Sequence, residues 1–181
     1  MSVDEGASTA ARLGAASRRL TVREAAAADW PAIWPFFREI VAAGETYAYD
    51  PELTEPQARE LWMVGPPGVT FVAEVDGTVA GSANAYANRP GAGSHVASAS
   101  FMVDPAQAGR GIGRALGERV IRWATDSGFR SIQFNAVVET NVRATGLWRS
   151  LGFEVIGTVP EAFRLPDGGL TGLHVMYRRL Y

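Results

Sequence analysis

The chain has 181 residues and a formal net charge of −2, with 47% hydrophobic and 20% charged residues. This length and apolar content are typical of one folded domain rather than two. The charge excludes the broadly basic surface of a nucleic-acid or anionic-membrane binder, so a small diffusible partner is favoured. The sequence contains no cysteine, which excludes disulfides, thiolate metal sites and a cysteine nucleophile and suits a reducing cytoplasm.

Residues 1–19 are rich in Ala, Ser, Gly and Arg and lack the continuous apolar stretch of a secretory signal. We therefore predict a disordered tail at 1–19, followed by a single domain over residues 20–181. An apolar run of about 18 residues, the length that a membrane-spanning helix needs, occurs nowhere in the sequence. We expect a cytoplasmic protein with no membrane partner and no nucleic-acid partner.

The first part of the domain is predicted to contain a short strand and two helices. Residues 20–22 alternate between apolar and polar as a strand does. An apolar-periodic stretch after Asp29, the expected N-cap, predicts an amphipathic helix that ends at Gly44. Thr54 and Gln57 have the spacing of a capping box, which predicts a second short helix.

Strands dominate the middle of the chain. Residues 69–75 and 78–87 are separated by Asp76-Gly77, a turn pair that supplies the positive φ angles of a tight hairpin. The pattern then predicts a third strand at 95–103, a glycine loop, a helix to about residue 127, a strand at 131–138, a helix at 141–151, and strands near 154–159 and 173–178. This order predicts an α+β fold, with a mixed central sheet of about seven strands and helices on both faces.

A glycine loop at residues 109–113 follows a strand and begins a helix. Unpaired N–H groups at the start of a helix, together with the helix dipole, form a concave anion site suited to a pyrophosphate. Such loops also occur for steric reasons alone, so other residues must decide. A dinucleotide-binding fold needs a third glycine where Arg114 stands and an acidic residue where Gln133 and Phe134 stand. The sequence therefore does not support a dinucleotide-binding fold.

Two motifs in the chain resemble those of the Gcn5-related N-acetyltransferases (GNAT). Gly111 and Gly113 match the family's coenzyme A loop, and residues 141–153 resemble its second signature, an Asn, then Ala, then Leu-aromatic, ending in Gly-Phe. The resemblance covers about residues 20–180. It implies the GNAT fold and direct transfer of an acetyl group from acetyl-CoA to an amine, with no metal.

The resemblance also implies which residues contact acetyl-CoA. They lie at the end of a strand, in the glycine loop and in the second signature: Met102, Val103, Ala108, Gly109, Arg110, Gly111, Ile112, Gly113, Arg114, Asn141 and Trp148. The loop's first position is Ala108, with Gln107 displaced by one, so a side-chain contact is lost while the backbone cradle is retained. The family tyrosine that commonly protonates the departing thiolate falls on Trp148, whose indole N–H is too weak an acid for that role. Asn141 also fits an ordinary helix N-cap.

A closer resemblance, carried by residues 134–141, 44–47 and Leu147-Trp148, is to the proline-analogue (azetidine-2-carboxylate) acetyltransferases. Two asparagines of that group help to hold substrate and cofactor; one matches Asn135, and the other falls on Ser98. Further substrate contacts are expected from Tyr47 and Tyr49, which lie in a loop, whereas Trp34 and Phe37 on the first helix are more typical of a core.

The superfamily reaction needs a backbone N–H that meets the developing oxyanion, and Val103 is the candidate donor. Asn135 stands in an otherwise apolar strand, where a buried amide either orients substrate or closes a structural hydrogen bond. Glu45 could accept the proton of the amine or could simply be solvated. His95 and His174 are too isolated to indicate a metal site.

The acceptor is predicted to be a small amine, resembling an amino or imino acid. Two other functions remain open: acetylation of a protein or peptide amine, and a non-catalytic sensor that binds acyl-CoA. Exposed strands at a sheet edge are also compatible with a homodimer.

Overall fold

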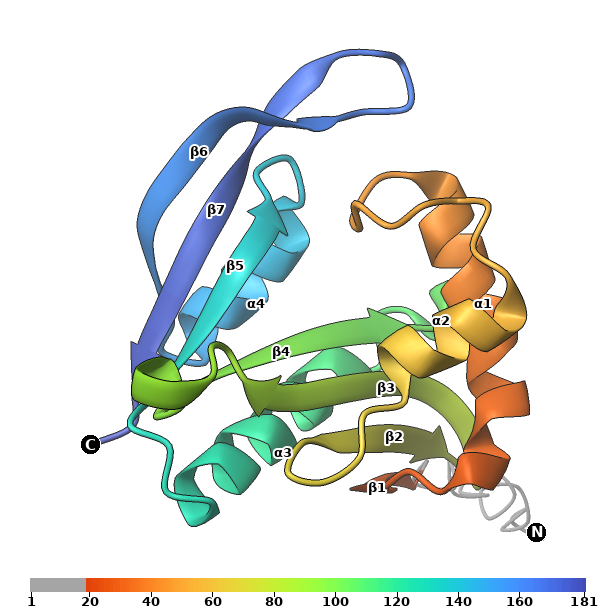
Figure 1. Ribbon diagram of the computed structural model, residues 1–181. Helices are drawn as coiled ribbons and strands as arrows, with labels where there is room; N and C mark the ends of the chain where they lie inside the picture. The colour runs from red at the N-terminus through yellow and green to blue at the C-terminus, as the bar shows by residue number, and fades with distance from the viewer. Residues whose placement is uncertain (1–18) are drawn as a thin grey trace, which may run out of the picture.

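The computed structural model describes residues 19–181, and the predicted tail lies outside the described part except for Arg19. Its framework is a seven-stranded sheet in the order β1-β2-β3-β4-β5-β7-β6 (Figure 1). The strands are β1 (Leu20–Glu24), β2 (Val69–Val75), β3 (Thr78–Ala87), β4 (Val96–Val103), β5 (Ser131–Val138), β6 (Glu154–Arg164) and β7 (Leu170–Arg179). The helices are α1 (Trp30–Ala43), α2 (Glu55–Trp62), α3 (Ile112–Asp126) and α4 (Val142–Ser150).

Every neighbouring pair of strands is antiparallel except β4 and β5, which are parallel. The parallel pair is short, because only Val96 with Ser131 and Ala97 with Ile132 are in register. Beyond these residues the two strands diverge, and Figure 1 shows β5, β6 and β7 leaning away from β4. The sheet therefore opens at its middle.

Helices cover both faces of the sheet, as the sequence predicts. On one face α3 and α4 pack against the inward side chains of β2 to β5, in a core that includes Phe71, Leu116 and Ile132. On the other face α1 and α2 form a second core, in which Phe37 and Trp62 are completely or almost completely buried. The predicted α+β fold with a mixed seven-stranded sheet is confirmed.

Local signals at the helix ends are mostly confirmed. Gly44 ends α1 with φ of 64°, and the capping box of α2 forms, with the Gln57 side chain accepting from the Thr54 N–H at 3.0 Å. The expected capping of α1 by the Asp29 side chain is wrong. Asp29 closes a short 3-10 turn instead, and its carboxylate accepts from the Ala26 N–H and pairs with Arg23 at 2.8 Å.

The last two strands are longer than expected, at 154–164 and 170–179 against 154–159 and 173–178. Most of β6 is exposed, so its outer half carries no apolar alternation that sequence reasoning could detect. The extra length makes β6 and β7 a hairpin that projects beyond the sheet and arches toward the C-terminal end of α1 (Figure 1). The turn of the hairpin lies close to the C-terminal end of α1. A methyl group added at Gly44 would lie 3.7 Å from Pro166 Cγ.

The close approach of α3 to β3 gives a stability prediction. A Cβ atom at Gly81 would lie 2.7 Å from Ile112 Cγ2 and 3.0 Å from the Met102 carbonyl oxygen. We expect Gly81→Ala to lower the free energy of unfolding by about 1–3 kcal/mol through overpacking, measured by urea denaturation. Gly157→Ala, where a Cβ atom meets nothing within 4 Å, is the matched control and should change it by less than about 0.5 kcal/mol. Equal effects of the two changes would contradict this account.

Candidate active site

The divergence of β4 from β5 exposes main-chain groups on one edge of β4. The Val96 carbonyl and the Asp104 N–H bond toward β3, whereas the His95 carbonyl bonds toward β5. Because these directions alternate along a strand, the N–H and C=O groups of Phe101 and Val103 face the opening. Sequence reasoning selected Val103 as a donor and missed Phe101, although the same alternation along the predicted strand could have indicated both.

Tyr47, in the loop between α1 and α2, reaches this edge of β4. Its hydroxyl donates to the Phe101 carbonyl at 2.7 Å and accepts from the Phe101 N–H at 2.9 Å. Its ring stacks on Tyr49 with centroids 5.0 Å apart and meets Trp62 edge-on at 6.2 Å. Burial raises the pKa of Tyr47 and of Tyr49, so both hydroxyl groups remain protonated at neutral pH.

The glycine loop lies where β4 leads into α3. Gly109 and Gly111 adopt φ angles of 82° and 78°, which side chains other than glycine rarely tolerate. Six consecutive N–H groups, from Gly109 to Arg114, donate to no group within residues 19–181, whereas the Ala108 N–H donates to the Pro105 carbonyl. Together with the positive end of the α3 dipole, these groups form a concave donor surface that fits a diphosphate.

The other residues expected to contact a cofactor have diverse positions. The Asn141 side chain caps α4 by accepting from the Ala144 N–H at 3.1 Å, so its structural role is confirmed. The Arg114 guanidinium donates to Ser150 Oγ at 2.7 Å, which ties α3 to α4. Arg110 is exposed. The Met102 side chain is buried in the core under α1 and α2, and by the same alternation along β4 its main-chain groups face β3, so Met102 is directed away from the opening.

Trp148 is 6% exposed and belongs to the core between the sheet and α4. Its ring lies 4.5 Å from that of Phe101 and 5.0 Å from that of Phe134, measured between centroids. Trp148 therefore supports the exposed edge of β4 from behind. Its indole contributes packing, at the position where the sequence resemblance leads us to expect a tyrosine.

The expectation that Asn135 is a buried amide in an apolar strand is wrong. Asn135 is exposed because the register of β5 with β7 shifts between Phe134 and Val137, which turns this part of β5 out of the core. Its side chain accepts from Gln133 Nε2 at 2.8 Å and donates to Asn88 Oδ1 at 2.6 Å. Asn88 was not selected from the sequence, where nothing distinguishes it from an ordinary loop residue.

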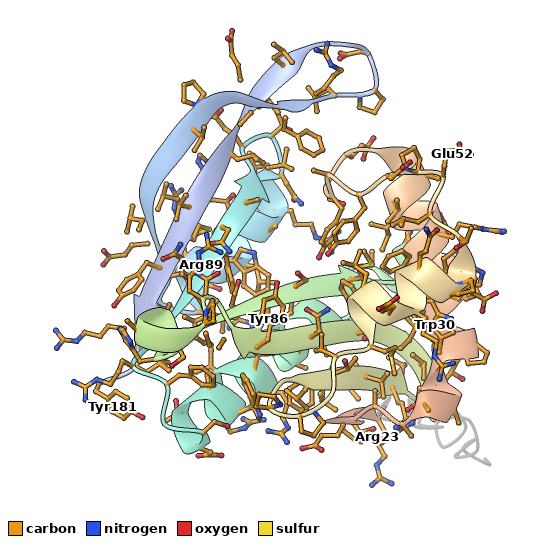
Figure 2. All side chains as sticks on the ribbon, in the orientation of Figure 1. Arg23, Trp30, Glu52, Tyr86, Arg89 and Tyr181 are labelled. Carbon is orange, nitrogen blue, oxygen red and sulfur yellow. The ribbon has the colours of Figure 1, made fainter. Side chains whose placement is uncertain are left out.

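A row of polar side chains lies on the α1 and α2 side of β3 and β4. Ser98 stands opposite Tyr86 and is 3% exposed, and Asn84 stands opposite Ser100 and is 2% exposed. The Asn84 amide donates to the Trp62 carbonyl at 3.0 Å, while its Oδ1 has no hydrogen-bond partner within residues 19–181. Figure 2 shows the Tyr86 side chain near the centre of the molecule, over the sheet. Tyr86 and the two buried residues thus place polar groups on the α1 and α2 side of β3 and β4.

Glu45 lies at the rim of a pocket of about 490 Å³. The pocket is bounded by the loop after α1, the loop between β5 and α4, and the turn of the β6–β7 hairpin: Glu45, Thr46, Thr140, Asn141, Leu165, Pro166 and Asp167. A larger depression of about 590 Å³ lies elsewhere, between α2 and the turn after β1. The smaller pocket is lined by Glu45 and Thr46, which directly precede Tyr47, so it is the better candidate for a substrate entrance.

Within residues 19–181, His, Asp and Glu side chains nowhere gather in groups of three that could hold a metal ion. A helix long and apolar enough to cross a membrane is also not found in this part of the chain.

Comparison with known proteins shows that this combination of an open sheet and a glycine loop belongs to an enzyme class, the acyltransferases. The model of the Acetyltransferase (GNAT) family matches residues 30–153. A solved GCN5-related N-acetyltransferase from Kribbella flavida is 68% identical, with a TM-score of 0.86 over 89% of this chain and 98% of that one. The chain belongs to the GNAT acetyltransferase family.

Other relatives are more distant. The N-acetyltransferase aca1 of Schizosaccharomyces pombe is 28% identical in an alignment 145 positions long, which covers 72% of this chain and 69% of that protein. A phosphinothricin acetyltransferase from Sinorhizobium meliloti in complex with acetyl-CoA is 28% identical, with a TM-score of 0.80 over 89% of this chain and 88% of that one. The acetyltransferase yncA of Salmonella typhimurium, solved with acetyl-CoA, is 26% identical, with a TM-score of 0.78 over 90% and 95% of the two chains.

The buried position of Trp148 predicts how a conservative change would act. We expect Trp148→Phe to lower the free energy of unfolding by about 1–3 kcal/mol, because the smaller ring leaves a cavity. We expect kcat for acetyl transfer to stay within about threefold of the original, since an indole N–H takes no part in proton transfer. Urea denaturation and steady-state kinetics measure the two quantities. A loss of turnover above about tenfold at unchanged stability would give the indole a chemical role.

Proposed function

We propose that the chain transfers an acetyl group from acetyl-CoA to the amine of a small molecule. The observation that carries this proposal is the run of six N–H groups from Gly109 to Arg114 that donate to no group in residues 19–181, in the loop that follows the open edge of β4. The run provides donors for a diphosphate, and the strand edge provides donors and acceptors for the amide groups of an extended arm. That two similar structures are described with acetyl-CoA supports the assignment.

Roles for the cofactor-binding residues follow from their positions. The N–H groups of Gly109, Arg110, Gly111, Ile112, Gly113 and Arg114 hold the diphosphate, and the guanidinium of Arg110 adds positive charge at the exposed side. The main-chain groups of Val103 pair with the arm that carries the thioester, and Met102 holds this part of β4 in place through its pairing with β3. Ala108 and Asn141 contribute by shaping the loop and the start of α4, and Trp148 by supporting β4.

On the acceptor side, Tyr47, Tyr49, Ser98 and Asn135 contact the substrate. A small acceptor is favoured because the β6–β7 hairpin approaches the end of α1 and leaves a pocket of about 490 Å³. The resemblance to proline-analogue acetyltransferases suggests a cyclic imino acid as one acceptor. Asn135 supports that assignment, since its amide lies at the surface of β5, whereas Ser98 replaces the second asparagine of that group.

The reaction needs little acid–base chemistry from the protein. The neutral amine nitrogen forms a bond to the acyl carbon, the carbonyl oxygen takes up negative charge, and collapse breaks the carbon–sulfur bond to release the thiolate. A backbone N–H of β4, from Phe101 or Val103, stabilises the oxyanion, and one such donor lowers a barrier by about 3–4 kcal/mol. The amine's proton passes to water or to Glu45, and the thiolate leaves without a proton from Trp148.

Release of free thiol from acetyl-CoA tests this function directly. The panel contains simple primary amines, amino acids, cyclic imino acids and a peptide with a free N-terminus. We expect kcat/KM to be at least about tenfold higher for a small amine than for the peptide, because the hairpin limits access. A preference for the peptide would indicate a protein acetyltransferase. Tight binding of acetyl-CoA without turnover on any acceptor would indicate a sensor.

Two glycines at opposite ends of α3 allow a matched test of the diphosphate site. Gly111 and Gly128 adopt φ angles of 78° and 80°, and a Cβ atom at either meets nothing within 4 Å. Alanine at either position should therefore cost about 1–2 kcal/mol of stability through backbone strain. Only Gly111→Ala should also weaken acetyl-CoA, by about fivefold or more in Kd measured by calorimetry, because it distorts the donor surface. Equal affinities of the two variants would place the diphosphate elsewhere.

A further inference from the structure

The Tyr47 hydroxyl occupies a distinctive place on the open edge of β4. It lies 2.9 Å from the Phe101 nitrogen and 2.7 Å from the Phe101 carbonyl oxygen, where an atom of a neighbouring strand would otherwise lie. An oxygen atom held there accepts from the Phe101 N–H. The position is therefore the one that the carbonyl oxygen of a thioester would take if Phe101 were its donor.

Packing limits how far Tyr47 can move when another oxygen takes that N–H. Its ring is stacked on Tyr49 and lies edge-on to Trp62, with centroids 5.0 Å and 6.2 Å away. Tyr49 is in turn stacked on Phe37 at 6.0 Å. A short displacement would leave the hydroxyl beside the acyl oxygen, with its proton available. Burial raises the pKa of Tyr47, so that proton is retained throughout the ordinary pH range.

Val103 cannot supply a second donor to the same oxygen. Its N–H lies two residues further along β4, which is a separation of about 6.6 Å in an extended strand. Within residues 19–181, the side-chain donor that bonds to Phe101 on this edge is the Tyr47 hydroxyl. Phe101 and Tyr47 together would hold the acyl oxygen from two sides.

We propose that the Tyr47 hydroxyl donates a hydrogen bond to the acyl oxygen of the bound thioester, beside the Phe101 N–H, and is thus a catalytic residue. This inference rests on the proposed function. As the amine nitrogen bonds to the acyl carbon, the π electrons move to the oxygen, and both donors strengthen their bonds to it. The electrons then return, the carbon–sulfur bond breaks, and the thiolate leaves. Tyr47 keeps its own proton from beginning to end.

Infrared difference spectroscopy of bound acetyl-CoA, labelled with ¹³C at the acyl carbonyl, tests the contact without any acceptor amine. Hydrogen bonds to a carbonyl lower its stretching frequency. We expect the bound band to lie below that of free acetyl-CoA in the unaltered chain and to shift partly back in Tyr47→Phe. Tyr181→Phe is the control: it removes a hydroxyl that donates to the Thr125 carbonyl at 3.2 Å, at the C-terminal end far from α1 (Figure 2). Its band should match that of the unaltered chain.

Kinetics with the best acceptor of the amine panel supply the second readout. We expect Tyr47→Phe to lower kcat by about 10²–10³-fold, the usual loss for one oxyanion donor, and to leave the Kd of acetyl-CoA within about threefold. Phenylalanine keeps the ring contacts, and thermal unfolding verifies that the variant folds. If the Tyr47 hydroxyl serves only to pair with the main chain of Phe101, Tyr47→Phe would lower the melting temperature without moving the carbonyl band.

The outcomes separate this inference from the function on which it rests. An unmoved band or an unchanged kcat in Tyr47→Phe overturns the role of Tyr47 while acetyl-CoA binding persists. A failure of the unaltered chain to bind acetyl-CoA in calorimetry overturns the proposed function, and the role of Tyr47 falls with it.

Discussion

The divergence of β4 from β5 is the constraint on which the rest of the structure depends. A sheet interior normally pairs every main-chain group, and leaving a strand edge unpaired inside a fold costs free energy. Here the parallel ladder ends after Ala97 and Ile132. The cost at Phe101 is offset by the Tyr47 hydroxyl, which pairs with both of its main-chain groups. The opening is thus maintained by a specific partner from the loop after α1.

The two cores give the opening its rigid walls. α3 and α4 fix one side, where Trp148 supports the Phe101 ring at 4.5 Å. α1 and α2 fix the other, where Trp62 donates its indole N–H to Ser82 at 2.9 Å and its carbonyl accepts from Asn84. These contacts tie α2 to β3, the strand adjacent to β4. A site made largely of main-chain atoms needs such support, because positional errors of a fraction of an ångström weaken hydrogen bonds to a transition state.

Local and periodic signals predicted most of the fold. Asp76-Gly77, Gly44 and the capping box of α2 act within a few residues, so the sequence alone specifies them. Features that depend on tertiary pairing were missed. The register shift that exposes Asn135 and the contact of Tyr47 with Phe101 arise between segments far apart in the chain. The length of the β6–β7 hairpin was missed for another reason, because most of β6 is exposed and its outer half lacks apolar alternation. The glycine loop was identified because its chemistry is concentrated in consecutive residues.

Main-chain donors have a consequence for how this chain can vary. Each N–H group of Phe101, Val103 and the loop from Gly109 to Arg114 survives replacement of its side chain by any residue except proline. Amino-acid changes in these segments therefore act through backbone shape and packing and rarely delete a contact outright. The amino-acid sequence of these segments can therefore change, and the surrounding loops can adapt to new acceptors, while the main-chain contacts to the acyl donor are retained.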